Sequence, residues 1–273
     1  MQLQTVSARH GANWVRLGFR VFFKRPMAFT ALFAAFMFAV VVLALLPVIG
    51  PLLVLVLLPL VTLAFMIATQ QVMAGQLVTP RAYALPFQGP RREAVAILQL
   101  GLLYAASTYA VLWLSDRVDG GAFDALMDAL PAAQTAPEVV AAKLADPRLL
   151  FGMLVRFGLA GLLSVPFWHA PALVHWDTQG AAQSLFSSTL ACWRNRGAFT
   201  VYSLVWFALV AGLGAFGSLV FGLLGAAKAF AAAAVPMSLF ITTVFYASLY
   251  FTFADSFAAN DAVPAPPTPP AST

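Results

Sequence analysis

The sequence predicts an all-α membrane protein: a polytopic bundle of six transmembrane helices with amphipathic helices at the membrane interface. Two observations predict it. Hydrophobic residues make up 62% of the 273 residues and charged residues only 9%, whereas a globular protein carries roughly 25% charged residues. The charged residues also gather between six long apolar stretches. Because this apolar surplus is too large for one protein core, lipid must solvate it.

Each apolar stretch has the roughly 20 residues that an α-helix needs to cross the hydrocarbon of a bilayer. Strands of a β-barrel would be about half as long and would alternate in polarity. The six predicted spans are residues 26–46, 48–68, 94–114, 149–173, 199–223 and 231–254. The uncharged link Leu46–Pro51 between spans one and two contains Pro and Gly, which predicts a tight helical hairpin.

We expect residues 1–259 to form a single membrane domain. Residues 260–273 hold five prolines and are predicted to be a disordered tail. The loop 115–148, between spans three and four, is the largest segment outside the spans. Two short amphipathic stretches in it predict helices over the outer ends of the spans. We interpret the loop as a solvated lid or spacer, with ligand gating as the alternative.

The charges between the spans predict an orientation. With the N-terminus inside, ten Lys and Arg residues fall on the inner side and four on the outer side, while the outer loop holds six of the ten acids. An excess of Lys and Arg marks the cytoplasmic side. The chain is therefore predicted to lie in a bacterial inner membrane with both termini cytoplasmic.

Two segments between the spans have the pattern of interfacial helices. In residues 13–24 an aromatic face lies opposite a basic one, and residues 178–193 have one apolar face; such helices lie in the headgroup layer. Both segments are followed by basic residues and enter a span through Ala-Phe-Thr, at residues 28–30 and 198–200. One interpretation is a repeat of three units, each with a basic interfacial segment and a helical hairpin. Chance similarity in an Ala- and Phe-rich chain is the alternative.

Arg156 is the strongest candidate for a polar functional residue, because ionisable residues inside a membrane are functional candidates by default. It lies seven residues into span four, about 10 Å deep at 1.5 Å per residue. Three interpretations stay open: the side chain extends to the interface, it pairs with Asp116 at the outer end of span three, or it binds an anionic substrate.

His169 and His175 flank the inner end of span four. Their spacing does not place them on one helical face, and no Glu or Cys completes a metal-binding set, so the sequence predicts an interfacial anchor with a kink at Pro171. In span five, small residues recur every four positions, which lets two helices approach closely. These residues are Gly214, Ser218, Gly222 and Ala226. They predict packing inside the bundle, with a homodimer face as the alternative.

The sequence lacks the motifs of common enzymes. It contains no H-E-x-x-H, G-x-S-x-G, P-loop or G-x-G-x-x-G pattern. The single cysteine, Cys192, excludes an internal disulfide and a cysteine-based metal cluster, and no basic stripe suggests nucleic-acid binding. We therefore expect no enzymatic activity and no cofactor.

Several segments resemble a known family. Met1–Val6, Gly11–Trp14 and Pro171–Trp176 are similar to an uncharacterised family of proteobacterial inner-membrane proteins known only by a locus-tag name. That resemblance covers nearly the whole chain except the Pro-rich tail. Gly180–Leu185 and Arg194–Phe199 are more weakly similar to repeats in the membrane domain found beside some bacterial glycerophosphodiester phosphodiesterases. Neither resemblance implies a known activity.

The sequence therefore predicts an accessory or structural component of the bacterial envelope, without enzymatic activity. Membrane lipids are the expected partners, together with other membrane proteins or a second copy bound through span five. The alternative is a carrier for a small molecule or a lipid, with Arg156 near an anionic group of the substrate.

Overall fold

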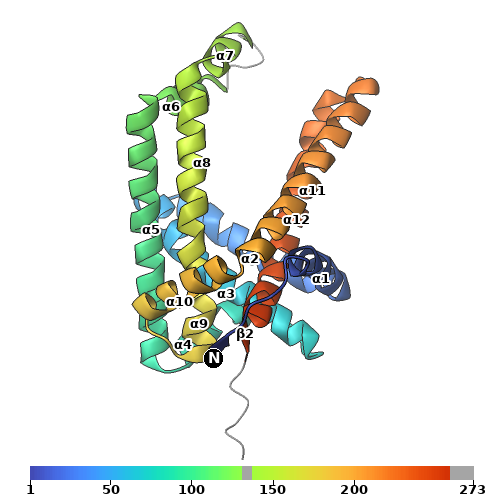
Figure 1. The fold of residues 1–273 in the computed structure, drawn as a ribbon. Coiled ribbons are helices and arrows are strands. Elements are labelled where there is room, and N and C mark those ends of the chain that lie inside the picture. Colours follow the sequence, from blue (N-terminus) through green and yellow to red (C-terminus); the bar gives the residue numbers. More distant parts are fainter. Residues whose placement is uncertain (131–136, 259–273) are drawn as a thin grey trace, which may run out of the picture. The chain divides into compact units, whose positions relative to one another are not determined.

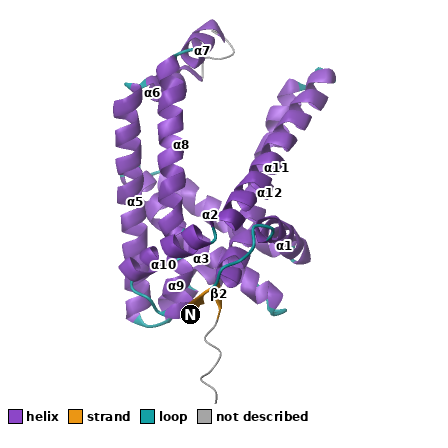
Figure 2. Cartoon of the chain, viewed as in Figure 1, coloured by secondary structure: helices purple, strands orange, loops and turns teal. Residues whose placement is uncertain are grey.

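The computed structural model describes residues 1–130 and 137–258. Among these residues, six helical segments are long and apolar enough to cross a membrane, which confirms the predicted all-α polytopic architecture. Helices make up most of the described chain, as Figure 2 shows. The Pro-rich tail 260–273 lies outside the described residues.

The helices form two compact units. Unit 1 contains Met1–Lys24 and the chain from Ala191 onward, and unit 2 contains Arg25–Leu190. The single membrane domain expected from the sequence stays a prediction. We describe each unit separately below.

Unit 2 holds the first four predicted spans. Its long helices are α2 (Pro26–Ala44), α3 (Ile49–Met73), α5 (Arg91–Asp119) and α8 (Pro147–Phe167), followed by the shorter α9 (Ala170–Asp177). Short helices connect them: η1 (Pro80–Tyr83), α4 (Leu85–Gln88), α6 (Ala122–Ala129) and α7 (Pro137–Leu144). The last two confirm the pair of short helices predicted in the outer loop.

Helix α3 is the centre of unit 2, because α2, α5 and α9 all pack against it. Phe65, Leu63 and Met66 of α3 are fully buried. The close approach of α5 depends on Gly101, since a Cβ there would collide with the Val56 carbonyl of α3. Helices α5 and α8 run side by side (Figure 1).

The predicted fourth span is two helices rather than one. Helix α8 ends at Phe167 and α9 begins at Ala170, so the chain breaks at Trp168 and His169. Pro171 lies in the first turn of α9, where a proline removes no helical hydrogen bond. The predicted interruption near Pro171 is therefore present as a two-residue turn at Trp168 and His169, just before the proline.

Unit 1 combines the two ends of the chain. It contains α1 (His10–Lys24), α11 (Arg196–Leu223) and α12 (Ala227–Ser256), and β1 (Gln2–Leu3) pairs antiparallel with β2 (Phe257–Ala258). Helix α10 (Ala181–Arg194) runs across the boundary between the two units.

Helix α1 packs against both α11 and α12. Its Trp14 is completely buried and donates a hydrogen bond from Nε1 to Asp255 Oδ2 at 2.7 Å. Gly11 allows the contact, because a Cβ there would stand 2.6 Å from the backbone nitrogen of Tyr202 and would collide with the Ala198 carbonyl. The amphipathic helix predicted for this segment is confirmed, and its aromatic face is covered by protein.

Candidate functional site

Arg156 lies in an ion cluster between α8 and α5. Its Nη2 donates to Asp116 Oδ1, and Asp119 Oδ2 lies 3.7 Å from the same nitrogen. The guanidinium also stands over the ring of Phe123, 3.9 Å from the ring centroid, in cation–π geometry. Arg156 is 11% exposed and Asp119 is 1% exposed, whereas Asp116 is 43% exposed. The cluster is therefore buried on the Asp119 side and open on the Asp116 side.

The pairing with Asp116, one of the three interpretations left open by the sequence, is present. One guanidinium and two carboxylates give the cluster a formal charge of −1. A negative cluster repels an additional anion, and more strongly in a medium of low dielectric constant. The electrostatics therefore disfavour an anionic ligand on Arg156 as long as both carboxylates stay ionised.

Two members of this cluster were missed from the sequence. Asp119 lies three residues after Asp116, a spacing that places both on one face of α5. Gly152, four residues before Arg156, allows α8 to approach, because a Cβ there would collide with the Asp119 side chain. The i, i+3 spacing of the acids is the signal that would have identified Asp119.

His169 is buried at the break between α8 and α9, with no exposed surface. Its backbone N–H donates to Ser188 Oγ at 2.9 Å, and the same hydroxyl donates to the Val165 carbonyl at 2.9 Å. Ser188 of α10 thus satisfies a donor and an acceptor near the helix break. Backbone groups at a break in a membrane helix need such partners, because lipid offers none.

His175 lies apart from this break and pairs with Glu93 instead. Its Nδ1 is 2.6 Å from Glu93 Oε1, which joins α9 to the first turn of α5. The two histidines predicted as an anchor therefore have different environments. Within residues 1–130 and 137–258, no group of three or more His, Cys, Asp or Glu side chains is placed to hold a metal ion.

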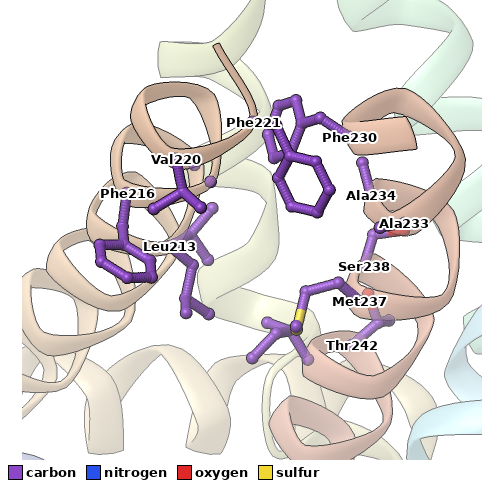
Figure 3. Close-up of a pocket in the computed structure, with 14 residues that line it drawn as sticks. Leu213, Phe216, Val220, Phe221, Phe230, Ala233, Ala234, Met237, Ser238 and Thr242 are labelled. Atoms are coloured by element: carbon purple, nitrogen blue, oxygen red, sulfur yellow. The ribbon is translucent and has the colours of Figure 1, made fainter. Parts of the chain in front are cut away.

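A third candidate is an apolar groove of about 540 Å³ between α11 and α12. Figure 3 shows Leu213, Phe216 and Val220 on one side of the groove and Ala233, Ala234 and Met237 on the other. Phe221 and Phe230 approach each other in it, with ring centroids 5.8 Å apart. The lining consists almost entirely of hydrocarbon, which suits an acyl chain or an apolar helix face better than a polar substrate.

The small-residue positions of span five are open rather than packed. Within unit 1, no atom lies within 4 Å of where a Cβ would stand on Gly214 or Gly222, and Ser218 is exposed. The glycine that contacts the neighbouring helix is Gly217, where a Cβ would collide with the Phe230 ring. Within unit 1, no helix therefore packs closely against Gly214 or Gly222, and the expected packing of span five inside the bundle stays a prediction.

Comparison with known proteins adds one relative over nearly the full length. The chain is 36% identical over 269 residues to the "Probable inner membrane protein BTH_II0599" of Burkholderia thailandensis, a match that covers 96% of each chain. No model of a protein family matches the sequence, so the weaker similarity to the phosphodiesterase-associated membrane domain stays a prediction. No solved structure matches it either. With its six membrane-spanning segments, the chain belongs to the family of this inner membrane protein and is an integral, multi-pass protein of the inner membrane.

Proposed function

We propose that the protein is a non-enzymatic accessory or structural component of the bacterial envelope, which acts by packing against a partner transmembrane helix through α11. The observation that supports this proposal is the open stripe of Gly214, Ser218 and Gly222. Small residues four positions apart associate with another helix, because they let two backbones approach closely. The partner is a second copy of the chain or another membrane protein.

Photocrosslinking from the stripe tests this proposal. A photoreactive amino acid at Ser218 is expected to crosslink to protein in intact cells, and one at Leu154, which is 64% exposed on α8, is expected to crosslink to lipid. Analysis of the crosslinked lipids and proteins by mass spectrometry identifies the partner. Crosslinks to lipid alone from both positions would contradict a partner helix on α11.

A matched pair of variants makes the test independent of the crosslinker. Replacement of both Gly214 and Gly222 by Leu fills the stripe and is expected to abolish the crosslinks from Ser218. Gly212→Leu changes a glycine of the same helix that is equally open and lies off the stripe, so the crosslinks should persist.

A carrier for a small molecule or lipid is the second candidate function. The observation that favours it is the break in span four at the buried His169, because discontinuous helices form the binding sites of many carriers. In this alternative Arg156 binds an anionic group of the substrate only after one of its carboxylates moves away. Arg156→Leu tests it: a variant that reaches the membrane in normal amount and fully complements a deletion strain would exclude this carrier role.

We further propose that both termini are cytoplasmic. The excess of Lys and Arg on the inner side supports the cytoplasmic orientation. The pairing of β1 with β2, which joins the two ends of the described chain, supports a shared side for both ends. The corresponding experiment is given in the Discussion.

A further inference from the structure

Unit 1 carries a row of exposed cations along one face of α1. Arg16, Arg20 and Lys24 follow one another at intervals of four residues, a spacing that places side chains on the same face of a helix. Arg9 lies about two turns before Arg16, immediately before the helix begins. All four side chains are exposed, and we call these four residues the basic row.

The opposite face of α1 is used for packing inside the protein. Trp14, Gly18 and Phe22 also recur every four residues, and all three are buried against α11 and α12. A Cβ on Gly18 would stand 2.5 Å from the Cβ of Ser248 in α12, so these two helices are in close contact. Because protein covers this apolar face, the face of α1 that remains for other molecules is the basic one.

The start of α11 adds two more cations beside Arg9. A Cβ on Gly197 would stand 3.6 Å from the Cβ of Ala8, so the chain around Arg196 contacts the chain around Arg9. Arg194 lies two residues before Arg196, at the end of α10. Both arginines are exposed. They extend the basic row at its N-terminal end, which gives a surface of six cations.

No acidic side chain neutralises the six cations within the described part of unit 1. Residues 1–24 contain no acid, and residues 191–258 contain only Asp255, whose carboxylate already accepts a hydrogen bond from the buried Trp14. None of the six cations forms an ion pair with a described residue. Like charges four residues apart on a helix repel each other, so an anion bound along the basic row would relieve this repulsion.

Exposed aromatic side chains flank the six cations. Phe23, three residues after Arg20, is 64% exposed, and Trp193, next to Arg194, is 70% exposed. The guanidinium of Arg196 lies 6.0 Å from the centre of the Trp193 ring. Helix α11, which begins at Arg196, is one of the membrane-spanning segments, so this end of the surface lies where a span enters the headgroup layer. Trp and basic residues together are typical of that layer, whereas a soluble polyanion would leave the aromatic rings in water.

We propose that the six cations bind anionic phospholipids at the membrane surface, with the guanidinium groups on the lipid phosphates and with Phe23 and Trp193 at the boundary with the acyl chains. A guanidinium can bind two phosphate oxygens at once, and each cation near an anionic membrane surface raises affinity by about fivefold. The occupant is a phospholipid with a net negative charge, such as phosphatidylglycerol. This surface is separate from the open stripe of α11, so this proposal and the proposed function can fail independently.

Competition between two lipids tests the proposal on the unaltered, full-length protein. Native mass spectrometry measures the binding of phosphatidylglycerol and phosphatidylcholine, which carry the same acyl chains and differ in net charge. Phosphatidylglycerol is expected to bind about tenfold better or more. This preference should shrink as the concentration of ammonium acetate is raised, because salt screens the charges. Equal binding of the two lipids would overturn the proposal.

A triple variant of α1 locates the lipid on the protein. Arg16→Gln, Arg20→Gln and Lys24→Gln together remove three charges from the basic row and are expected to reduce the preference for phosphatidylglycerol by about tenfold or more. Arg16→Lys with Arg20→Lys keeps both charges and should retain most of the preference. A preference that survives in the folded triple variant would also overturn the proposal.

A second triple variant is the matched control. Arg81→Gln, Arg91→Gln and Arg92→Gln remove the same charge from exposed positions of unit 2. This variant should retain the preference for phosphatidylglycerol, because the basic row is intact. An equal reduction in the two triple variants would show that the preference follows the net charge of the protein, and it would overturn the assignment to α1.

A third arm tests a soluble polyanion as the occupant. Heparin is added to the protein in nanodiscs of phosphatidylcholine, and binding is measured by thermophoresis. No binding of heparin, together with the lipid preference above, supports the lipid assignment. Heparin binding that is lost in the triple variant of α1, without a preference for phosphatidylglycerol, would overturn the proposal in favour of a soluble acidic partner.

Discussion

At the scale of single residues, the Ser188 hydroxyl bonds to two backbone groups that would bond to each other in an unbroken helix. Its hydroxyl accepts from His169 N and donates to Val165 O. We predict that Ser188→Ala lowers the free energy of unfolding by about 1 kcal/mol, since side-chain hydrogen bonds in membrane proteins contribute about 0.6 kcal/mol on average. Unfolding in a denaturing detergent measures this. Ser187→Ala, a change at the neighbouring and partly exposed position, should have almost no effect on the free energy of unfolding. Equal losses in the two variants would contradict the role given to Ser188.

Arg156 is a second residue whose loss has a defined electrostatic consequence. Arg156→Leu leaves Asp119, which is 1% exposed, without its counter-charge, and removal of one partner of a buried ion pair costs about 3 kcal/mol or more. We expect Arg156→Leu to lower the free energy of unfolding by this amount. The double variant with Asp119→Asn should lose less, because the neutral Asn side chain needs no counter-charge.

Arg148→Leu is the control for this prediction. Arg148 is exposed near the start of the same helix, so its replacement should change stability by less than about 0.5 kcal/mol. A double variant no more stable than Arg156→Leu alone would show that Asp119 is not the group that Arg156 stabilises.

At the scale of helices, the docking of α1 depends on close backbone contact. A side chain at Gly11 would collide with α11 at Ala198 and Tyr202, and overpacking typically costs 1–3 kcal/mol. We predict that Gly11→Ala increases the rate of tryptic cleavage at Arg16 and Arg20 by about tenfold, because local opening exposes α1 to the protease. Gly197→Ala is the control, since its Cβ would stand 3.6 Å from Ala8 in ordinary contact. Unchanged cleavage in Gly11→Ala would contradict this packing.

Helix α10 shows how an element adapts to an apolar surrounding. In the part that belongs to unit 2, Ser184 and Ser188 are completely buried, whereas Phe186 is 69% exposed and Leu190 is 40% exposed. In this helix the small polar residues are buried and the large apolar residues are exposed. This is the reverse of the pattern in water-soluble helices. It suits a helix whose outer face meets lipid, as expected from the sequence for residues 178–193.

At the scale of the whole molecule, the two ends of the described chain are joined. Besides the pairing of β1 with β2, the Asn195 side chain accepts a hydrogen bond from Val6 N at 2.8 Å and donates to the Gln4 carbonyl at 3.0 Å. Both ends must therefore lie on the same side of the membrane.

We predict that reporters fused to either terminus give the same result. Green fluorescent protein should fluoresce at both ends and alkaline phosphatase, which is active only in the periplasm, should be silent at both. Active phosphatase at both ends would reverse the proposed orientation and keep the shared side. Opposite results at the two ends would contradict the joining of the termini itself.

The architecture was predictable from the sequence to a large extent. The spans, the two short helices of the outer loop and the amphipathic segment of α1 follow from local hydrophobicity, which is a property of neighbouring residues. An interruption of span four near Pro171 was also anticipated, because a proline is tolerated in the first turn of a helix but not in its interior. The three-unit repeat stays a prediction.

The candidate sites were predictable only in part. Arg156 was identified from its depth and charge, and its pairing with Asp116 was one of three interpretations that the sequence left open, whereas Asp119 and Gly152 were missed. Ser188 was missed for a different reason: a serine in an amphipathic helix gives no sign that it bonds to backbone atoms 19 and 23 residues away. Long-range contacts of this kind leave no local pattern.

The sequence by itself determined that this chain spans a membrane, where its spans lie and which of the loops between them carry the charged residues. Only the tertiary structure decided that Arg156 faces two carboxylates, that Ser188 completes span four, and that the stripe of Gly214 and Gly222 is open while Gly217 is packed. The physical reason is that lipid tails and the faces of helices are equally apolar. Hydrophobicity therefore shows which residues avoid water, and only the packing of the helices shows which of them meet protein and which meet lipid.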